Sequence, residues 1–270
     1  MPDSPPVLAL GVEYDGSSYC GWQRQPGQRS VQAALEDALS SIAAESIRTV
    51  AAGRTDAGVH ATSQVVSFAS RVERTLDAWV RGTNSLTEES IAVQWAANVP
   101  STFHARYSAT ARRYHYVVLE SERRPTVLDR RVTWSRAPLD DGAMYRAARS
   151  LIGEHDFTTF RAASCQASTP FRCVHALDVR RFADFVVIDV VANAFLHHMV
   201  RNVASALLAV GRGEREERWI GESLLARDRN RIGATAPPDG LYLVEVRYAT
   251  ALDLPGFRPP PMLGALGDIW

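Results

Sequence analysis

The stretch that decides the fold is VLALGVEYDG, residues 7–16. Apolar side chains alternate along it and share one face, at Leu8, Leu10, Val12 and Tyr14. Asp15 and Gly16 follow as a turn signal. The pattern predicts a strand over 7–14 that ends in a tight turn.

Five further elements are expected before Pro100. Helical spacing of apolar residues predicts a helix from Val31 to Ile42, capped by Ser30. Short strands fit 47–52 and 64–68, and they are followed by a helix over 75–86 and a strand over 91–97. The resulting order, strand, helix, strand, strand, helix, strand, is that of the split βαβ arrangement in ferredoxin-like and RRM-like domains.

The order repeats after Pro100, with a strand over 111–119, a helix over 141–151, strands over 172–182 and 185–192, further helices, and a last strand over 241–248. We therefore predict an α/β (α+β) protein of two similar RRM-like or ferredoxin-like halves, with largely antiparallel sheets joined around a central cleft. The predicted divisions are residues 1–104, residues 105–250 and a Pro-rich C-terminal arm over 251–270.

Composition excludes several classes of protein. The chain has 270 residues, 46% hydrophobic and 22% charged, which suits a globular protein. Its start, MPDSPPVLAL, lacks the basic and apolar runs of an export signal, and Arg201 interrupts the longest apolar stretch, so no membrane span is expected. Cys20, Cys165 and Cys173 form no CxxC pair, which argues against a disulfide framework or a zinc site. A cytoplasmic protein is expected.

Charge is unevenly distributed along a chain of zero formal charge. All 30 basic residues are Arg, and residues 101–136 hold eight of them against three acids. This excess predicts that polyanions bind on one face of the protein rather than all over it. The competing interpretation is a solvated charged face without a ligand.

The segment GRTDAGVHA, residues 53–61, places one acid among small residues between two predicted strands. Its glycines allow unusual backbone angles, and Arg54 lies close enough in sequence to hold the Asp56 carboxylate ionised. Such an aspartate can act as a nucleophile or a base. The alternative is an ordinary turn with a local ion pair. His60 is either a proton shuttle or a hydrogen-bonded structural histidine.

A second candidate is ARRYHY, residues 111–116. Strand alternation sends Tyr114 and Tyr116 to the face opposite Arg113 and His115. An aromatic ring beside basic residues can stack on an unpaired base, although core packing is the other common role of a tyrosine.

Two further pairs suggest weaker hypotheses. Cys173 and His175 could in principle serve a thiol-dependent hydrolase, but no supporting motif accompanies them. The adjacent His197 and His198 lack a third ligand at suitable spacing, so no metal site is expected.

Taken together, the motifs resemble those of the TruA-type tRNA pseudouridine synthases over almost the whole chain. The resemblance rests on GVEYDGSSYCGWQRQP, AAGRTDAGVHA, FHARYSATARRYHY, LIGEHDFTTFR, VVANAFLHHMVRN and GLYLVEVRY. It implies the pseudouridine synthase fold, with Asp56 as the catalytic residue, Arg54 as its ion-pair partner that also assists base flipping, Tyr114 as the uracil-stacking residue and Leu243 as part of the apolar pocket.

The resemblance also implies two RNA-binding regions besides Arg74. One comprises Phe103, His104, Ala105, Arg106 and Tyr107; the other comprises Ser164, Cys165, Gln166, Ala167 and Ser168. The second, SCQAS, lacks the basic residue that relatives can carry there.

The activity that the resemblance implies is an isomerase that converts uridine to pseudouridine at positions 38, 39 and 40 in the anticodon stem-loop of tRNA. Base flipping would expose the uridine, and Asp56 would drive cleavage and re-joining of the glycosidic bond. The family acts as a homodimer and needs no cofactor and no metal. The main alternative is a non-catalytic RNA-binding protein; the thiol-dependent hydrolase is the third hypothesis.

Overall fold

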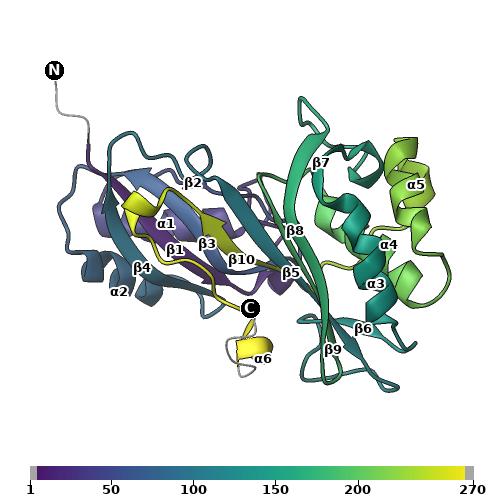
Figure 1. Ribbon diagram of the computed structural model, residues 1–270. Helices are drawn as coiled ribbons and strands as arrows, with labels where there is room; N and C mark the ends of the chain where they lie inside the picture. The colour runs from purple at the N-terminus through teal and green to yellow at the C-terminus, as the bar shows by residue number, and fades with distance from the viewer. Residues whose placement is uncertain (1–4, 265–270) are drawn as a thin grey trace. The chain divides into compact units, whose positions relative to one another are not determined.

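The computed structural model describes residues 5–264, which form two compact units (Figure 1). The first unit comprises residues 5–112 and 242–264, and the second comprises residues 113–241. Both mix helices with sheet, as predicted.

In the first unit, the predicted opening strand is central to the sheet. It forms β1 (Val7–Tyr14) and pairs antiparallel with β4 (Ile91–Val99) on one side and β3 (His60–Ala69) on the other. The short β2 (Val50–Ala51) pairs with β3, and β10 (Leu241–Arg247) lies parallel to β3. The alternation read from residues 7–14 therefore marks a strand with a neighbour on each side.

Two capped helices cover one face of this sheet (Figure 1). They are α1 (Val31–Ala43) and α2 (Leu76–Leu86), whose caps Ser30 and Thr75 accept backbone hydrogen bonds from Ala33 and Ala78. The α2 residue Trp79 is buried and packs edge-on against Phe68 of β3, with ring centroids 5.2 Å apart. Both predicted helices are confirmed within a few residues.

The predicted divisions at 104/105 and 250/251 differ from these units. The chain leaves the first unit after Arg112 and returns to it at Tyr242. Residues 251–264 are not a separate arm, because hydroxyl groups of β3 bind their backbone. Ser63 Oγ donates to Gly256 O at 2.7 Å, and the Thr62 hydroxyl donates to Arg258 O. The rest of the predicted arm, residues 265–270, lies outside the described residues.

The second unit has the strand order β5-β9-β8-β7, with antiparallel pairing of β8 with both β9 and β7. These strands are β5 (Ala111–Glu120), β9 (Phe185–Ala192), β8 (Phe171–Phe182) and β7 (Gly153–Asp156). A further strand, β6 (Thr133–Ser135), runs parallel to β5. The sequence did not predict β6 and β7, because three or four residues are too few to show alternation.

Helices gather beside this second sheet (Figure 1). They are α3 (Asp141–Ala148), α4 (Met199–Gly211) and α5 (Arg218–Ala226). The chain also contains α6 (Pro261–Gly264) and 3-10 turns at Gly16–Ser18, Arg149–Leu151, Thr158–Phe160, Arg229–Ile232 and Thr250–Leu252.

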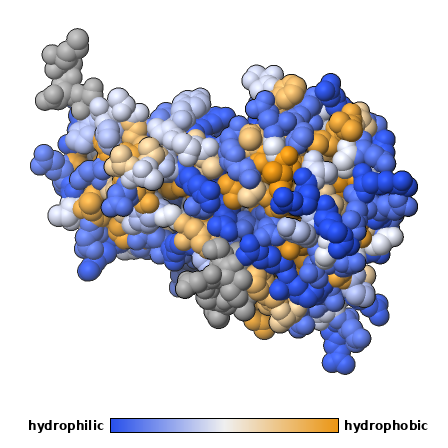
Figure 2. Space-filling view, in the orientation of Figure 1, coloured by the Kyte–Doolittle hydropathy of each residue, from blue (hydrophilic) through white to orange (hydrophobic). Residues whose placement is uncertain are grey.

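Within residues 5–264, none of the helices combines the length and the apolar composition that crossing a membrane requires. The face of the molecule in Figure 2 is mostly hydrophilic, and its apolar residues form separate small patches.

Candidate active-site loop and nucleic-acid interface

Asp56 lies on the segment 53–59, which joins β2 to β3 and is called the Asp56 loop below. The strand β3 starts at His60, four residues earlier than predicted, so the loop leads directly into a buried strand. Gly58 has a φ of +79°, and the backbone N–H of Val59 donates to Asp56 O at 3.2 Å. These contacts form a tight turn that leaves Asp56 half-buried and Arg54 exposed.

A fully buried amide holds the start of this loop. Gln64 Nε2 donates to Gly53 O at 2.7 Å, and Gln64 Oε1 accepts from the N–H groups of Gly53 at 3.4 Å and Val65 at 3.2 Å. Beside it, the hydroxyl groups of Tyr14 and Thr55 form a hydrogen bond of 2.8 Å. Burial raises the pKa of Tyr14 to about 12, so the phenol stays neutral and can donate.

The segment after β1 supports the loop from another side through close backbone contacts. Trp22 N–H donates to Thr55 O at 3.0 Å. A Cβ atom on Gly16 would lie 1.9 Å from Val59 O, and one on Gly21, whose φ is +96°, would lie 2.8 Å from Thr55 O. Glycine is therefore required at both positions for the GVEYDGSSYCGW stretch to approach the loop.

Arg112 supports the loop from within the protein. It is buried, and its guanidinium donates to the carbonyl oxygens of Ala52 at 2.9 Å, Ala109 at 3.2 Å and Arg106 at 2.5 Å. Five rigid N–H donors suit such multiple carbonyl contacts. Arg112 thus links the residue before the Asp56 loop to the FHARY segment, residues 103–107, and it does not belong to the surface that the charge excess predicted.

His60 has the structural role that was one of its two predicted alternatives. Its ring is 2% exposed and stacks on Tyr242 of β10, with centroids 4.7 Å apart. His60 Nδ1 lies 3.2 Å from Gly16 N and 3.1 Å from Asp15 Oδ1. The hydrogen bond with His60 holds the pKa of Asp15 well below its usual range, against the opposing effect of burial.

The predicted ion pair between Arg54 and Asp56 is not formed. Among the described residues, no pair of nitrogen and oxygen atoms within 4.0 Å joins these two side chains. Arg54 is exposed, and an exposed guanidinium gains little from a single ion pair because water already solvates it.

The FHARY segment, residues 103–107, divides into buried anchors and exposed side chains. Phe103 packs against Tyr248 with ring centroids 5.1 Å apart, and Ala105 N–H donates to Ser67 Oγ at 3.1 Å. The Tyr107 side chain is 76% exposed, with the Arg106 guanidinium 5.7 Å and the His104 ring 4.3 Å from its ring centre. Of the predicted contacts, His104, Arg106 and Tyr107 are therefore the ones placed to reach a ligand.

The other predicted residues of the first unit lie on separate elements. Leu243 is fully buried on β10, beside Ala61 of β3. Arg74 is exposed immediately before α2 and donates to Glu73 O at 3.1 Å.

Tyr114 belongs to the second unit and is 7% exposed, with its ring edge-on to Phe195 at 5.1 Å. The predicted alternation is confirmed, because Arg113 and His115 share the other face. Arg113 donates to both carboxylate oxygens of Asp189, at 2.8 and 2.5 Å, and His115 Nε2 lies 3.5 Å from Asp189. Burial raises the pKa of Asp189, but hydrogen bonds from Arg113 and His115 outweigh it and hold the pKa at about 2.

The segment 164–168 also belongs to the second unit. Ser164, Gln166 and Ser168 are exposed, Ala167 is half-buried and Cys165 is buried. Arg161 donates to Cys165 O at 2.9 Å, so a basic residue that lies outside the SCQAS stretch holds its backbone. Nearby, Cys173 Sγ lies 3.7 Å from His175 Nδ1, which places the thiol and the imidazole of the third hypothesis in contact.

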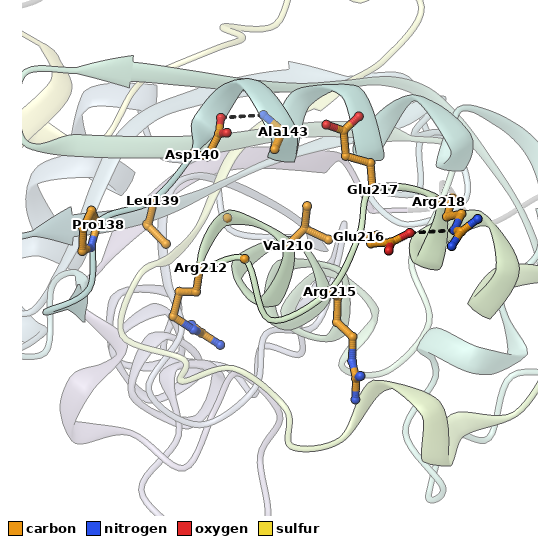
Figure 3. A pocket seen from close by; sticks show the side chains of 12 residues that line it. Pro138, Leu139, Asp140, Ala143, Val210, Arg212, Arg215, Glu216, Glu217 and Arg218 are labelled. Atoms are coloured by element: carbon orange, nitrogen blue, oxygen red, sulfur yellow. Dashed lines mark hydrogen bonds and ion pairs between the residues drawn. The ribbon is translucent and has the colours of Figure 1, made fainter.

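A hollow of about 860 Å³ in the second unit contains none of the predicted site residues (Figure 3). Its lining includes three arginines, Arg212, Arg215 and Arg218, and three acids, Asp140, Glu216 and Glu217. Arg218 pairs with Glu216 at 2.7 Å, and Asp140 caps α3. With balanced and internally bonded charges, the hollow does not favour a phosphate group.

Comparisons with known proteins agree with the family resemblance of the sequence motifs. A family profile described as tRNA pseudouridine synthase matches residues 11–108 and 147–249. A protein from Klebsiella pneumoniae subsp. pneumoniae named tRNA pseudouridine synthase A is 53% identical over 255 residues, 94% of each chain. Proteins of the same name from Nitrosococcus oceani and Escherichia coli are each 52% identical, over 94% and 95% of this chain and 98% and 95% of their own.

The chain belongs to the tRNA pseudouridine synthase family, because the profile covers more than half of it and the identity extends over almost its full length. This membership supports the isomerase interpretation over the non-catalytic and hydrolase alternatives.

We predict that Gln64→Leu lowers the free energy of unfolding by about 1–3 kcal/mol, because the half-buried backbone N–H and C=O groups of Gly53 lose their partner. Urea denaturation measures this loss, and amide hydrogen exchange at Gly53 should accelerate. Gln94→Leu, at an exposed position on β4, is the matched control and should change stability by less than about 0.5 kcal/mol. Equal stability of the two variants would show that Gln64 does not hold the loop.

The lowered pKa of Asp189 predicts a specific loss of stability in acid. Because the folded pKa of about 2 lies below the ordinary value of about 4, the ionised group stabilises the fold above pH 4, and this contribution disappears as pH falls from 4 to 2. Asp189→Asn should remove about 2–3 kcal/mol at pH 6, and progressively less as pH falls toward 2, in urea titrations at each pH.

Asp77→Asn, at an exposed ion pair, is the control and should leave the pH profile unchanged. A difference between wild type and Asp189→Asn that is constant from pH 6 to pH 2 would contradict the assignment.

Proposed function

We propose that this protein isomerises uridine to pseudouridine in the anticodon stem-loop of tRNA, at positions 38, 39 and 40, with Asp56 as the catalytic residue. The observation that carries the proposal is the placement of Asp56 on a loop held from three sides, in a chain about half identical to tRNA pseudouridine synthases A. We further propose that it acts in the cytoplasm as a homodimer, as the family resemblance implies.

The reaction is an isomerisation, so substrate and product contain the same atoms. The bond from ribose C1′ to uracil N1 breaks, the base turns, and C1′ bonds to C5; the proton on C5 is lost and N1 gains one. No oxidant, reductant or second substrate is needed. Asp56 can add to C6 of uracil, attack C1′, or take a proton from the ribose, and each route uses one positioned carboxylate.

Positioning is what the surrounding residues supply. Gln64 and Arg112 bind the backbone of Gly53 and Ala52, just before Asp56, and the Tyr14 hydroxyl binds that of Thr55, so the carboxylate needs little reorganisation when a substrate binds. Half-burial leaves part of Asp56 accessible. In this proposal Leu243, fully buried on β10, contributes to the apolar pocket.

The target base must leave the helical stack before it can react, which costs a few kcal/mol. The exposed Arg54 can enter the vacated space, because no carboxylate among the described residues holds its guanidinium. Tyr114 would stack on the flipped uracil.

The RNA backbone would be held by exposed groups outside the loop. Arg74, Arg106 and Tyr107 offer charge and an aromatic surface, and His104 supports the Tyr107 ring. Segment 164–168 would contribute mainly backbone and hydroxyl contacts.

We predict that Asp56→Asn abolishes pseudouridine formation, by at least about 10³-fold, and changes tRNA affinity by less than about threefold, because the carboxylate acts on the reacting base. Carbodiimide adducts and reverse-transcription stops map the product on an unmodified tRNA transcript. Asp77→Asn is the control and should remain active. Residual turnover by Asp56→Asn close to that of wild type would refute the assignment, and tight binding with no product from either protein would favour the non-catalytic alternative.

Arg54→Ala should lower the single-turnover rate by about 10- to 100-fold, because flipping loses the side chain that fills the vacated stack. The same variant should keep the thermal stability of wild type, since Arg54 makes no ion pair with Asp56. Arg81→Ala, an exposed arginine on α2, should leave the rate unchanged. An unaltered single-turnover rate for Arg54→Ala would remove Arg54 from the flipping step.

A further inference from the structure

One basic segment is not used by the contacts proposed so far. Residues 121–136, called the arginine loop below, lead from β5 into and just beyond β6. They contain five arginines, Arg123, Arg124, Arg130, Arg131 and Arg136, all exposed, against two acids, Glu122 and Asp129. From this placement we infer that the arginine loop binds the sugar-phosphate backbone of the tRNA substrate; the inference rests on the proposed function.

The unbalanced charge of the loop is the first argument. Several exposed arginines elsewhere have carboxylate partners: Arg81 pairs with Asp77 at 2.9 Å, Arg146 with Glu217 at 2.7 Å and Arg218 with Glu216 at 2.7 Å. In residues 5–264, no carboxylate oxygen lies within 4.0 Å of Arg123, Arg124 or Arg136. These three guanidinium groups therefore retain their full capacity for an external anion.

The loop is also held in shape, which separates it from a disordered basic tail. Ser121 N–H donates to Ser135 O at 3.0 Å, and Trp134 Nε1 donates to Ser121 O at 2.8 Å, so its two ends are joined. Near its tip, Arg131 N–H donates to Leu128 O at 3.0 Å. Arginines on a closed loop lose less conformational entropy on binding than arginines on a free chain.

The position of the loop within the second unit leaves it accessible. Figure 1 shows β6 and its connection beside the turn between β8 and β9, and Glu120 N–H donates to Asp184 O of that turn at 2.8 Å. In Figure 2 this edge ends in a hydrophilic projection. Val127 is 93% exposed, which confirms that the tip stands clear of the unit.

RNA is the partner that this chemistry fits. Arginine binds phosphate bidentately, and a row of phosphates presents several such groups at a spacing that a single small anion lacks. The hollow in Figure 3 provides the contrast, because its arginines are matched by acids and it offers no excess charge. Three contacts would release about three condensed counterions, and their signature is the salt dependence of binding.

The decisive experiment compares two triple variants that lose the same charge. The test variant is Arg123→Gln/Arg124→Gln/Arg136→Gln, and the control is Arg81→Gln/Arg146→Gln/Arg218→Gln, which removes three exposed, ion-paired arginines. Anisotropy titrations with an unmodified full-length tRNA transcript across a KCl series give Kd and the slope of log Kd against log salt. Pseudouridine formation by wild type and by the test variant is measured on the same transcript.

The test variant should weaken binding at least about tenfold at the lowest salt and reduce the slope by about two to three, while kcat at saturating tRNA stays unchanged and KM rises. The control should keep the wild-type slope. A third variant, Arg123→Lys/Arg124→Lys/Arg136→Lys, keeps the charge and should keep the slope, which separates the electrostatic effect from an effect of loop structure.

The outcomes distinguish the two proposals. An active wild type, with a test variant whose Kd and slope equal those of the control, would overturn the arginine loop alone. A wild type that binds the transcript but forms no pseudouridine would overturn the proposed function. Equal losses in the glutamine and lysine variants would show that the loop acts through its structure, and this result also overturns the electrostatic inference.

Discussion

The rest of the candidate site depends on one constraint: the polar backbone groups of the Asp56 loop must be satisfied where the loop meets a buried strand. Gln64 meets this constraint from the middle of β3, where its neighbours Val65 and Val66 are apolar and buried. A buried amide is costly unless its polar groups are hydrogen-bonded. Here the Gly53 carbonyl accepts from the Gln64 amide nitrogen, and the Gly53 N–H donates to the Gln64 amide oxygen. The same bonds that make Gln64 tolerable in the core fix the backbone three residues before Asp56.

The other contacts of the Asp56 loop also satisfy its polar backbone groups. Gly16 and Gly21 remove the side chains that would keep two backbones apart, and Trp22 N–H then satisfies Thr55 O. Arg112 is buried and donates to carbonyl oxygens within the FHARY segment, just after it and just before the Asp56 loop, at Arg106, Ala109 and Ala52. A rearrangement of the FHARY segment or of the Asp56 loop would therefore leave donors of the buried Arg112 unpaired, which couples the predicted RNA contacts to the Asp56 loop.

Local sequence patterns predicted most of the helices and strands. Most of the features that the sequence did not predict depend on contacts between residues distant in sequence. Ser30 and Thr75 each precede a run of apolar residues at helical spacing, and both cap the helix that follows. The alternation in residues 7–14 and 111–119 identifies both strands correctly. The return of β10 to the first unit depends on its pairing with β3, about 180 positions earlier, which no local pattern encodes. In the same way, the sequence identifies Asp56 as a candidate, but it does not show that Gln64 and Arg112 bind the backbone just before it, because backbone partners leave no pattern in the sequence.

A net charge of zero hides two populations of arginine with different physical roles. One population is neutralised inside the protein, as in Arg113 with Asp189, or serves as a rigid set of donors, as in Arg112. The other, which includes Arg54, Arg123 and Arg136, is exposed without a carboxylate partner in the part of the chain that the structure describes. Composition does not distinguish the two populations. Only the surroundings of each arginine show where the protein attracts a polyanion. Several of the acids that balance the total pair with arginines at other exposed positions, as Asp77, Glu217 and Glu216 do, so they do not neutralise the arginines of this second population.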